Sequence, residues 1–372
     1  MGSGIIVESG VTGMRRHYTQ SDSLRSPGRN SGFTMIEILI TIGIMGLLVT
    51  ILIFALGPSL ESARINATRT TLEQLDAAIQ ARLDAIQRLD VSVEAKKLAA
   101  LNSGMSQEEA EFFIRKNLVK QALPQRPEDL RGMDGTDGNA DDSPINAAYQ
   151  GSGGHSSASA NQPERCSEVL LFALTQGGTV RVMPSGKSYS IPTLDIGELN
   201  TSHLVDSDSN GLQEVIDEWD NPIRFYRWPT RLIRTGGAGA TISASDVTYA
   251  RTLIASLGKN TSNNGPLATD PDDPTGLLYN DFTSMSLSIR YGTGMSDTVS
   301  ADSFGEAAYH TPATFHAPLL MSLGPDETSG MAGEPTSGTA ADRLGLLEDT
   351  DTMTAGIQPA DSLFDNITNR QQ

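Results

Sequence analysis

Residues 38–56 form an apolar run without a charged side chain, and this run constrains the fold more than any other feature of the 372-residue sequence. The run extends upstream to Phe33, with Glu37 as its one charged residue. A helix over 33–56 would be about 36 Å long at ~1.5 Å per residue, enough to cross the hydrocarbon core of a bilayer. A buried helix of a soluble protein is the alternative, but such helices are usually shorter. The sequence therefore predicts a transmembrane helix over 33–56.

The segment before this run is positively charged, whereas the chain beyond it is acidic. Residues 1–32 contain four arginines and two carboxylates, which are Arg15, Arg16, Arg25, Arg29, Glu8 and Asp22. Because positive residues flank membrane helices on the cytoplasmic side, we expect a cytoplasmic N-terminus and an extracytoplasmic C-terminal part. A signal peptide cut after Ala55-Leu56-Gly57 is the first alternative, but its apolar region is usually only about 7–15 residues long.

Glu37 is the second constraint, because a lone carboxylate inside an apolar run is costly in lipid and indicates a function. Its expected partner is a positive charge at the same depth. A cut between Gly32 and Phe33 would supply that charge as the new amine of Phe33, in the same chain or in a neighbouring one. The arginines of residues 1–32 would then belong to a removed leader.

The stretch Gly32-Phe33-Thr34-Met35-Ile36-Glu37 resembles the N-terminal signature of type IV pilins and of type II secretion pseudopilins. The resemblance implies that prepilin peptidase cuts after Gly32 and N-methylates Phe33, and that Glu37 pairs subunits during assembly. It also implies an α+β, type IV pilin-like fold, in which a long N-terminal membrane-spanning helix packs on a small antiparallel sheet. Because the chain is over twice a typical family member's length, we expect large loop insertions.

Beyond the membrane run, apolar residues recur mostly at steps of three and four, which predicts that the helix continues over 57–103. Pro58 should kink this helix rather than end it, and Asn102-Ser103-Gly104 is a plausible stop. Ser106 with Glu109 three residues later forms a capping-box pattern, which predicts a second helix to about Ala122.

Short strands are predicted at Val169–Leu174, Ile223–Trp228 and Met285–Tyr291. Polar, Gly-rich stretches at about 131–163, at about 235–275 and after 330 indicate solvated loops. The predicted organisation is a leader at 1–32, a transmembrane helix at 33–56, its continuation at 57–103, a helix with a polar insertion at 104–165, a globular domain at 166–330 and a polar tail at 331–372.

Residues 206–217 have the ligand spacing of a calcium-binding loop. Oxygen-bearing residues occupy positions one, three and five, Gly211 is at position six, and further ligands follow at positions seven, nine and twelve. The candidates are Asp206, Asp208, Asn210, the backbone carbonyl of Leu212, Glu214 and Asp217. The glycine permits the turn that brings about six to eight oxygens around a hard cation. A solvated acidic turn is the alternative, and an isolated loop would bind calcium weakly, in a structural role.

Two further segments resemble motifs of the major pseudopilins of type II secretion. The sequence Trp219–Tyr226 resembles their Trp-Gly-x-Pro-x-x-Tyr turn, with Asp220 where Gly is usual. Residues Ser322–Asp326 resemble their C-terminal Ser-x-Gly-x-Asp motif, and Glu327 stands where Gly commonly follows. In that family a calcium site is built from the C-terminal region, so the resemblance makes Asp326 a candidate calcium ligand.

The resemblance implies a structural subunit of a type II secretion pseudopilus, anchored by one helix in the inner membrane with a cytoplasmic N-terminus and a periplasmic C-terminal domain. The implied partners are prepilin peptidase, other pseudopilin subunits, the inner-membrane assembly platform and membrane lipid. A type IV or competence pilin and a signal-anchored extracytoplasmic calcium-binding module are the alternatives.

Other function classes have little support in the sequence. A formal charge of −18 argues against nucleic-acid binding. An enzyme is disfavoured because no His-Glu-x-x-His, Gly-x-Ser-x-Gly or phosphate-loop pattern occurs. The five histidines are His17, His155, His203, His310 and His316. Cys166, the one cysteine, excludes an intrachain disulfide and is expected to be a small buried hydrophobic residue.

Overall fold

A computed structural model describes residues 33–103, 105–132, 137–138, 142–154, 163–183, 185–227, 229, 288–292, 295–298, 318–329, 334–336 and 367–369. The chain divides into two compact units, Met1–Pro58 and Ser59–Gln372, which are considered separately below. Gly32 and the loop predicted at about 235–275 lie outside the described residues.

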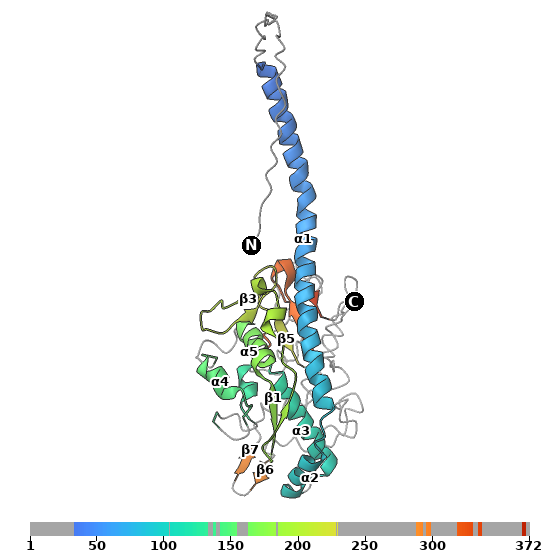
Figure 1. The fold of residues 1–372 in the computed structure, drawn as a ribbon, viewed down its shortest axis with the longest axis vertical. Helices are drawn as coiled ribbons and strands as arrows, with labels where there is room; N and C mark the ends of the chain where they lie inside the picture. Colours follow the sequence, from blue (N-terminus) through green and yellow to red (C-terminus); the bar gives the residue numbers. More distant parts are fainter. Residues whose placement is uncertain are drawn as a thin grey trace, which may run out of the picture. The chain divides into compact units, whose positions relative to one another are not determined.

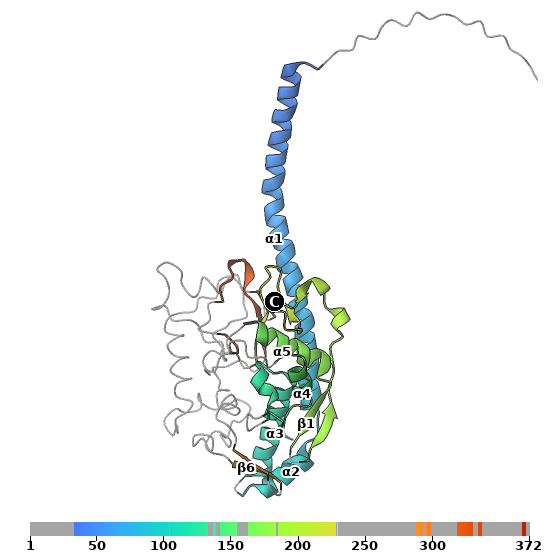
Figure 2. The ribbon, with the colours of Figure 1, turned by 90° about the vertical axis from the view of Figure 1, so that its left-hand side faces the viewer.

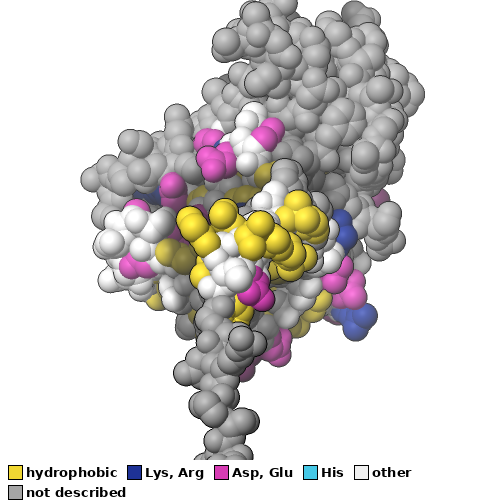
Figure 3. Space-filling view, turned by 90° about the horizontal axis from the view of Figure 1, so that it is seen from above, with side chains coloured by type: hydrophobic (Ala, Val, Ile, Leu, Met, Phe, Trp, Pro, Cys, Tyr) yellow, Lys and Arg dark blue, Asp and Glu magenta, His cyan; other side chains and the backbone are white. Residues whose placement is uncertain are grey.

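The first unit contains the start of helix α1 (Met35–Gln87), which Figure 1 and Figure 2 show in blue. Its stretch Met35–Leu52 is long and apolar enough to cross a membrane. Large hydrophobic side chains such as Ile36, Leu39 and Met45 are exposed there. Figure 3 shows hydrophobic side chains gathered at this end of the helix when it is viewed end on. The long apolar N-terminal helix predicted from the sequence is therefore present.

Helix α1 continues through Pro58, as predicted, but it ends at Gln87. The prediction of one continuous helix over 57–103 is therefore wrong. A separate helix α2 (Ser92–Leu101) follows and ends near the predicted stop. Arg115 explains the break, because its guanidinium donates to the carbonyls of Ile86, Gln87 and Leu89 at 3.2–3.3 Å and so satisfies the C-terminal end of α1.

Helix α3 (Gln107–Ala122) confirms the predicted capping box at Ser106 and Glu109, in which each side chain accepts the other residue's backbone N–H. The predicted strand at Val169–Leu174 is wrong, because these residues lie within helix α5 (Pro163–Gln176). The run Val-Leu-Leu-Phe-Ala-Leu is apolar at every position, so periodicity alone could not separate a buried strand from a buried helix. Pro163 at the first helical position and Glu164 in the first turn favour the helix.

Short helical segments connect these elements: η1 (Pro127–Leu130), α4 (Asn146–Gly151), η2 (Ile196–Glu198), η3 (Thr201–His203) and η5 (Gly324–Asp326). The described strands are β1 (Thr179–Val182), β2 (Lys187–Ser190), β3 (Leu204–Val205), β4 (Glu214–Val215), β5 (Arg224–Tyr226), β6 (Ser288–Gly292), β7 (Met295–Thr298), β8 (Leu319–Ser322) and β9 (Ile367–Thr368).

The described strands pair only in antiparallel fashion, which confirms the α+β class with small antiparallel sheets. They form three two-stranded sheets, β1–β2, β3–β4 and β6–β7, and one three-stranded sheet in the order β5-β8-β9. Strands β5 and β6 match the segments predicted around 223–228 and 285–291. The predicted polar tail contributes β9, and Asn369 next to it donates to Asp76 Oδ1 on α1 at 2.6 Å.

The core of the second unit forms where α1 meets α2, α3, α5 and the strands. The α1 side chains in it are Leu72, Leu75, Ile79 and Ile86. Arg82 is buried among them and donates to the carbonyls of Ala122, Ala173, Leu174, Gly177 and Pro192 at 2.6–3.1 Å. One guanidinium thus satisfies the C-terminal carbonyls of α3 and α5 together.

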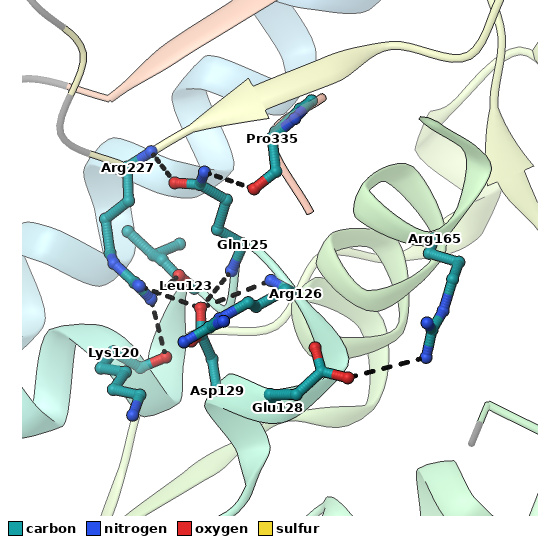
Figure 4. A network of polar contacts seen from close by, with 9 residues as sticks. All are labelled: Lys120, Leu123, Gln125, Arg126, Glu128, Asp129, Arg165, Arg227 and Pro335. Atoms are coloured by element: carbon teal, nitrogen blue, oxygen red, sulfur yellow. Dashed lines mark hydrogen bonds and ion pairs between the residues drawn. The ribbon is translucent and has the colours of Figure 1, made fainter. Parts of the chain in front are cut away.

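A second buried polar network surrounds Asp129 of η1 (Figure 4). Its carboxylate accepts hydrogen bonds from Arg227 Nη2 at 2.9 Å and from Arg126 Nε at 3.2 Å. Burial by itself would raise the pKa of Asp129, but the two guanidinium groups outweigh it and hold this pKa below its ordinary range. The network fastens η1 to the end of β5, and its charges are paired with one another.

Candidate functional site

The start of α1 is fixed by a reciprocal pair of hydrogen bonds between Thr34 and Glu37. Thr34 Oγ1 accepts the Glu37 backbone N–H at 3.3 Å, and Glu37 Oε2 accepts the Thr34 backbone N–H at 3.4 Å. This is the capping-box arrangement, in which the carboxylate turns back toward the helix N-terminus. Phe33 adjoins the pair and is exposed. Glu37 is the predicted assembly residue, and Phe33 is the predicted new N-terminus. The structure thus places the Glu37 carboxylate at the peptide group that links Phe33 to Thr34.

The predicted calcium loop connects β3 to β4, and its first residues fold on themselves. Asp206 accepts the backbone N–H groups of Asn210 and Gly211 at 3.0 and 3.1 Å. Asp208 accepts the same Asn210 N–H at 3.1 Å. Gly211 has φ +93°, a backbone conformation that favours glycine.

Glu214, at position nine, is fully buried and points back into this loop. Its Oε1 accepts the Ser207 backbone N–H at 2.7 Å, whereas its Oε2 has no hydrogen-bond partner in the described part of the chain. Burial raises the pKa of Glu214, and the charge of Asp208 adds to this effect.

Glu168 on α5 adds a further carboxylate next to this loop, and sequence patterns do not single it out because they predict a strand directly after it. Its Oε1 accepts Asn210 Nδ2 at 2.6 Å, and its Oε2 lies 3.5 Å from the Tyr149 hydroxyl. The pKa of Glu168 is raised to about 7, mainly by burial and in smaller part by the charges of Asp208 and Glu214. Glu168 is buried within α5, as are Cys166 and Val169.

Two of the other predicted ligands, Asp217 and Asp326, have their hydrogen-bond partners outside these first loop residues. Asp217 accepts the Ser322 hydroxyl at 2.7 Å and the Trp219 and Asn221 backbone N–H groups at 2.8 and 2.9 Å. Asp326 is exposed and accepts the Thr328 N–H. The Leu212 side chain is buried in a small apolar cluster. Within the described ranges, no three His, Cys, Asp or Glu residues are placed as a ready metal-binding group.

The turn at Trp219 is tied to α1 by a buried histidine that sequence patterns did not single out. His203 Nδ1 is 2.6 Å from Thr71 Oγ1 on α1, and its Nε2 is 2.8 Å from Glu218 Oε1. The Glu218 backbone N–H also donates to Thr68 Oγ1 on α1 at 3.2 Å. The His203–Thr71 contact is buried and the two contacts of Glu218 are partly buried, and together they fix the turn to α1.

Cys166 is buried, and its thiol donates to the Phe225 carbonyl at 3.3 Å. Burial raises the pKa of this thiol to about 12, which leaves almost no thiolate at neutral pH. The expected structural role of Cys166 agrees with this environment.

Comparison with protein-family models identifies the prokaryotic N-terminal methylation motif over residues 27–53. The match spans the predicted cut, Phe33, Glu37 and most of the apolar run. No curated protein and no solved structure was found to match the chain. The chain therefore carries a prepilin-type signal of the kind found in type IV pilins and pseudopilins, followed by a membrane-anchoring helix.

Proposed function

We propose that this chain, with its N-terminal methylation motif, is a structural subunit of a type II secretion pseudopilus. Prepilin peptidase removes residues 1–32 and methylates Phe33, and the subunit is anchored in the inner membrane with its C-terminal domain in the periplasm. Assembly then involves other pseudopilin subunits and the inner-membrane assembly platform. A type IV or competence pilin has the same N-terminal signal and is the alternative.

The position of Glu37 carries the proposal for processing and assembly. Its carboxylate already accepts the N–H of Thr34, the second residue after the proposed cut. A charged amine on Phe33 would therefore form close to this carboxylate, and in lipid an unpaired carboxylate is costly. In a bundle of such helices, the same carboxylate could pair with the Phe33 amine of a neighbouring subunit.

Two backbone conformations support the secretion subtype. Asp220 and Glu327 stand where the major pseudopilin motifs usually have glycine, and both are left-handed, with φ +65° and +59°. Only a small share of residues other than glycine take this conformation. The backbone thus follows the glycine geometry of both motifs although the glycines are absent. The Ser322–Asp217 hydrogen bond also joins the two motif segments in space.

The cleavage test is co-expression of the full chain with a prepilin peptidase, followed by N-terminal sequencing and mass spectrometry of the membrane fraction. We expect a product that begins with methylated Phe33. Gly32→Leu should retain the leader, and Ser31→Ala should be processed as the wild type. A wild-type product that keeps residues 1–32, or that begins after Gly57, would contradict the proposal.

The subtype test is deletion of the gene in the source bacterium, with complementation by the wild-type chain. A secretion pseudopilin predicts that exported enzymes accumulate in the periplasm, while surface pili and DNA uptake are unchanged. Loss of pili or of DNA uptake with normal secretion would instead favour the pilin alternative.

A further inference from the structure

The segment between β2 and β3 contains a short acceptor pattern around Asn200. Residues 198–202 read Glu-Leu-Asn-Thr-Ser, so that a serine follows the asparagine at the second position. Asparagine with serine or threonine two positions later is the acceptor pattern for N-linked glycosylation, and it is typical of a surface loop in an exported protein. The same pattern occurs at three further positions, Asn66, Asn260 and Asn366, of which the structure describes Asn66.

Asn200 lies on the surface, and its side chain is folded onto the residues that follow it. The side chains of Asn200, Thr201 and Ser202 are exposed. Asn200 caps the short helix η3, and its Oδ1 accepts the Ser202 backbone N–H at 3.2 Å. Nδ2 becomes a nucleophile only when it loses a proton, and the resulting negative charge gathers on Oδ1. The Ser202 N–H is therefore placed to stabilise the reactive form of this amide.

The amide nitrogen of Asn200 is open to an incoming group. It makes no hydrogen bond within the part of the chain that the structure describes. The Nδ2 of Asn210 differs, because it donates to Glu168 Oε1 at 2.6 Å. The Nδ2 of Asn369 likewise donates to Asp76 Oδ1 at 2.6 Å. A group can thus bond to Asn200 Nδ2 without the loss of a described contact, whereas at the other two positions it would break one.

Asn66 has the same sequence pattern, but its place in the fold is unsuitable. It lies inside α1, where each backbone N–H donates to the carbonyl four residues back. The Thr68 N–H therefore cannot turn to the Asn66 side chain as the Ser202 N–H turns to Asn200. Thr68 is also fully buried, and its Oγ1 accepts the Glu218 backbone N–H at 3.2 Å. Asn66 is thus an internal comparison with the same pattern in a different conformation.

We propose that Asn200 is an N-glycosylation site that accepts an oligosaccharide from a lipid diphosphate carrier. Asn200 Nδ2 forms a bond to the anomeric carbon of the sugar, and the bond from that carbon to the diphosphate oxygen breaks. The lipid diphosphate leaves with the electron pair, and a base of the transferring enzyme takes one amide proton. Glu198 is exposed and supplies a negative charge that a basic residue of this enzyme can bind. The modification rests on the proposed function in one respect, because it requires an extracytoplasmic C-terminal domain.

The test is transfer in vitro to the purified full chain in detergent, with a bacterial oligosaccharyltransferase and a lipid-linked oligosaccharide. We expect peptide mass spectrometry to find the glycan on Asn200 and none on Asn66. A standard acceptor peptide in the same reaction shows that the enzyme is active. An unmodified Asn200 beside a modified standard peptide, or transfer to Asn66 in preference to Asn200, would overturn the proposal. The assay needs neither cleavage at Phe33 nor export, so its failure is distinct from failure of the proposed function.

Variants of the acceptor segment assign the role of each residue. Asn200→Gln should abolish transfer at this position, and Ser202→Ala should lower it by about tenfold or more, whereas Ser202→Thr should retain it. Glu198→Gln keeps the side-chain shape without the charge and should lower the transfer rate by about fivefold. Glu73→Gln, at an exposed position on α1, is the matched control and should react as the wild type. Circular dichroism checks that each variant is folded, and unchanged transfer to a folded Ser202→Ala variant would overturn the assignment.

Discussion

The hydroxyl of Ser322 donates a 2.7 Å hydrogen bond to Asp217 Oδ2, and this contact joins the end of β8 to the turn that contains Trp219. The other oxygen of Asp217 accepts the backbone N–H groups of Trp219 and Asn221. Both Asp217 and Ser322 are buried. One carboxylate thus shapes a turn and fixes it to a strand about a hundred residues away in sequence.

Removal of either partner should destabilise the second unit, because the other partner is left buried and unsatisfied. We expect Ser322→Ala to lower the free energy of unfolding by about 1–2 kcal/mol, and Asp217→Asn by a similar amount. The double variant should lose less than the sum of the two. Urea unfolding of the full chain in detergent measures these values. Ser188→Ala, at an exposed strand position, is the control, and additive losses would contradict a direct interaction.

The left-handed residues Asp220 and Glu327 give a second prediction. Glycine takes φ near +60° without the steric cost that a side chain adds. Asp220→Gly and Glu327→Gly should therefore keep or raise the unfolding free energy, by up to about 1 kcal/mol each. Asp195→Gly, at φ −76°, should lower it. Chemical denaturation compares the three variants, and a loss of stability in both motif variants would argue against glycine-like turns.

Arg82 should be among the least replaceable residues of the second unit. Lys at this position keeps a positive charge but cannot reach the carbonyls at the ends of both α3 and α5. We expect Arg82→Lys to cost about 3 kcal/mol or more in unfolding free energy, or to prevent folding. Arg88→Lys, at a position with an exposed side chain, should change stability by less than about 0.5 kcal/mol. Thermal unfolding of both variants in parallel checks this, and a stable Arg82→Lys variant would contradict it.

The stability of the calcium-free chain should fall as the pH rises toward neutrality. Burial raises the pKa of Glu168 from 4.5 to about 7, so folding favours its protonated form. The contribution of protonated Glu168 to the free energy of unfolding is therefore complete below pH ~4.5, and it is lost as the pH rises through about 7. We expect a loss of roughly 1–2 kcal/mol across this window, after allowance for solvent screening. Guanidinium unfolding at several pH values should show a flatter profile for Glu168→Gln, and an unchanged profile would contradict the assignment.

Local sequence signals predicted those parts of the fold that depend on neighbouring residues. The apolar run of α1, the Ser106–Glu109 capping box and β5 were each predicted from a few consecutive residues, and the structure contains them. The spacing of the β3–β4 loop likewise predicted that Asp206, Asp208 and Glu214 would lie in one turn region.

Interactions between distant parts of the sequence could not be predicted in this way. Glu168 reaches the loop only because 163–176 is a helix, and its all-apolar segment has no distinguishing period. His203 and Arg82 are held by partners that only the tertiary fold brings near, and nothing in their local sequence marks them. The break after Gln87 likewise depends on Arg115 of α3.

The charge of Glu37 provides the sharpest test of assembly. Glu37→Gln keeps the side-chain shape and an oxygen that can accept the Thr34 N–H, so the start of α1 should be preserved. It removes the charge that would pair with the Phe33 amine of a neighbouring subunit. In cells that contain the assembly system, we expect the variant to be cut at Phe33 and to accumulate in the membrane, with incorporation into sheared filaments reduced by about tenfold or more. Glu73→Gln, at an exposed position farther along α1, is the control and should assemble as the wild type. Normal filament incorporation of Glu37→Gln would show that the side chain serves only to cap the helix.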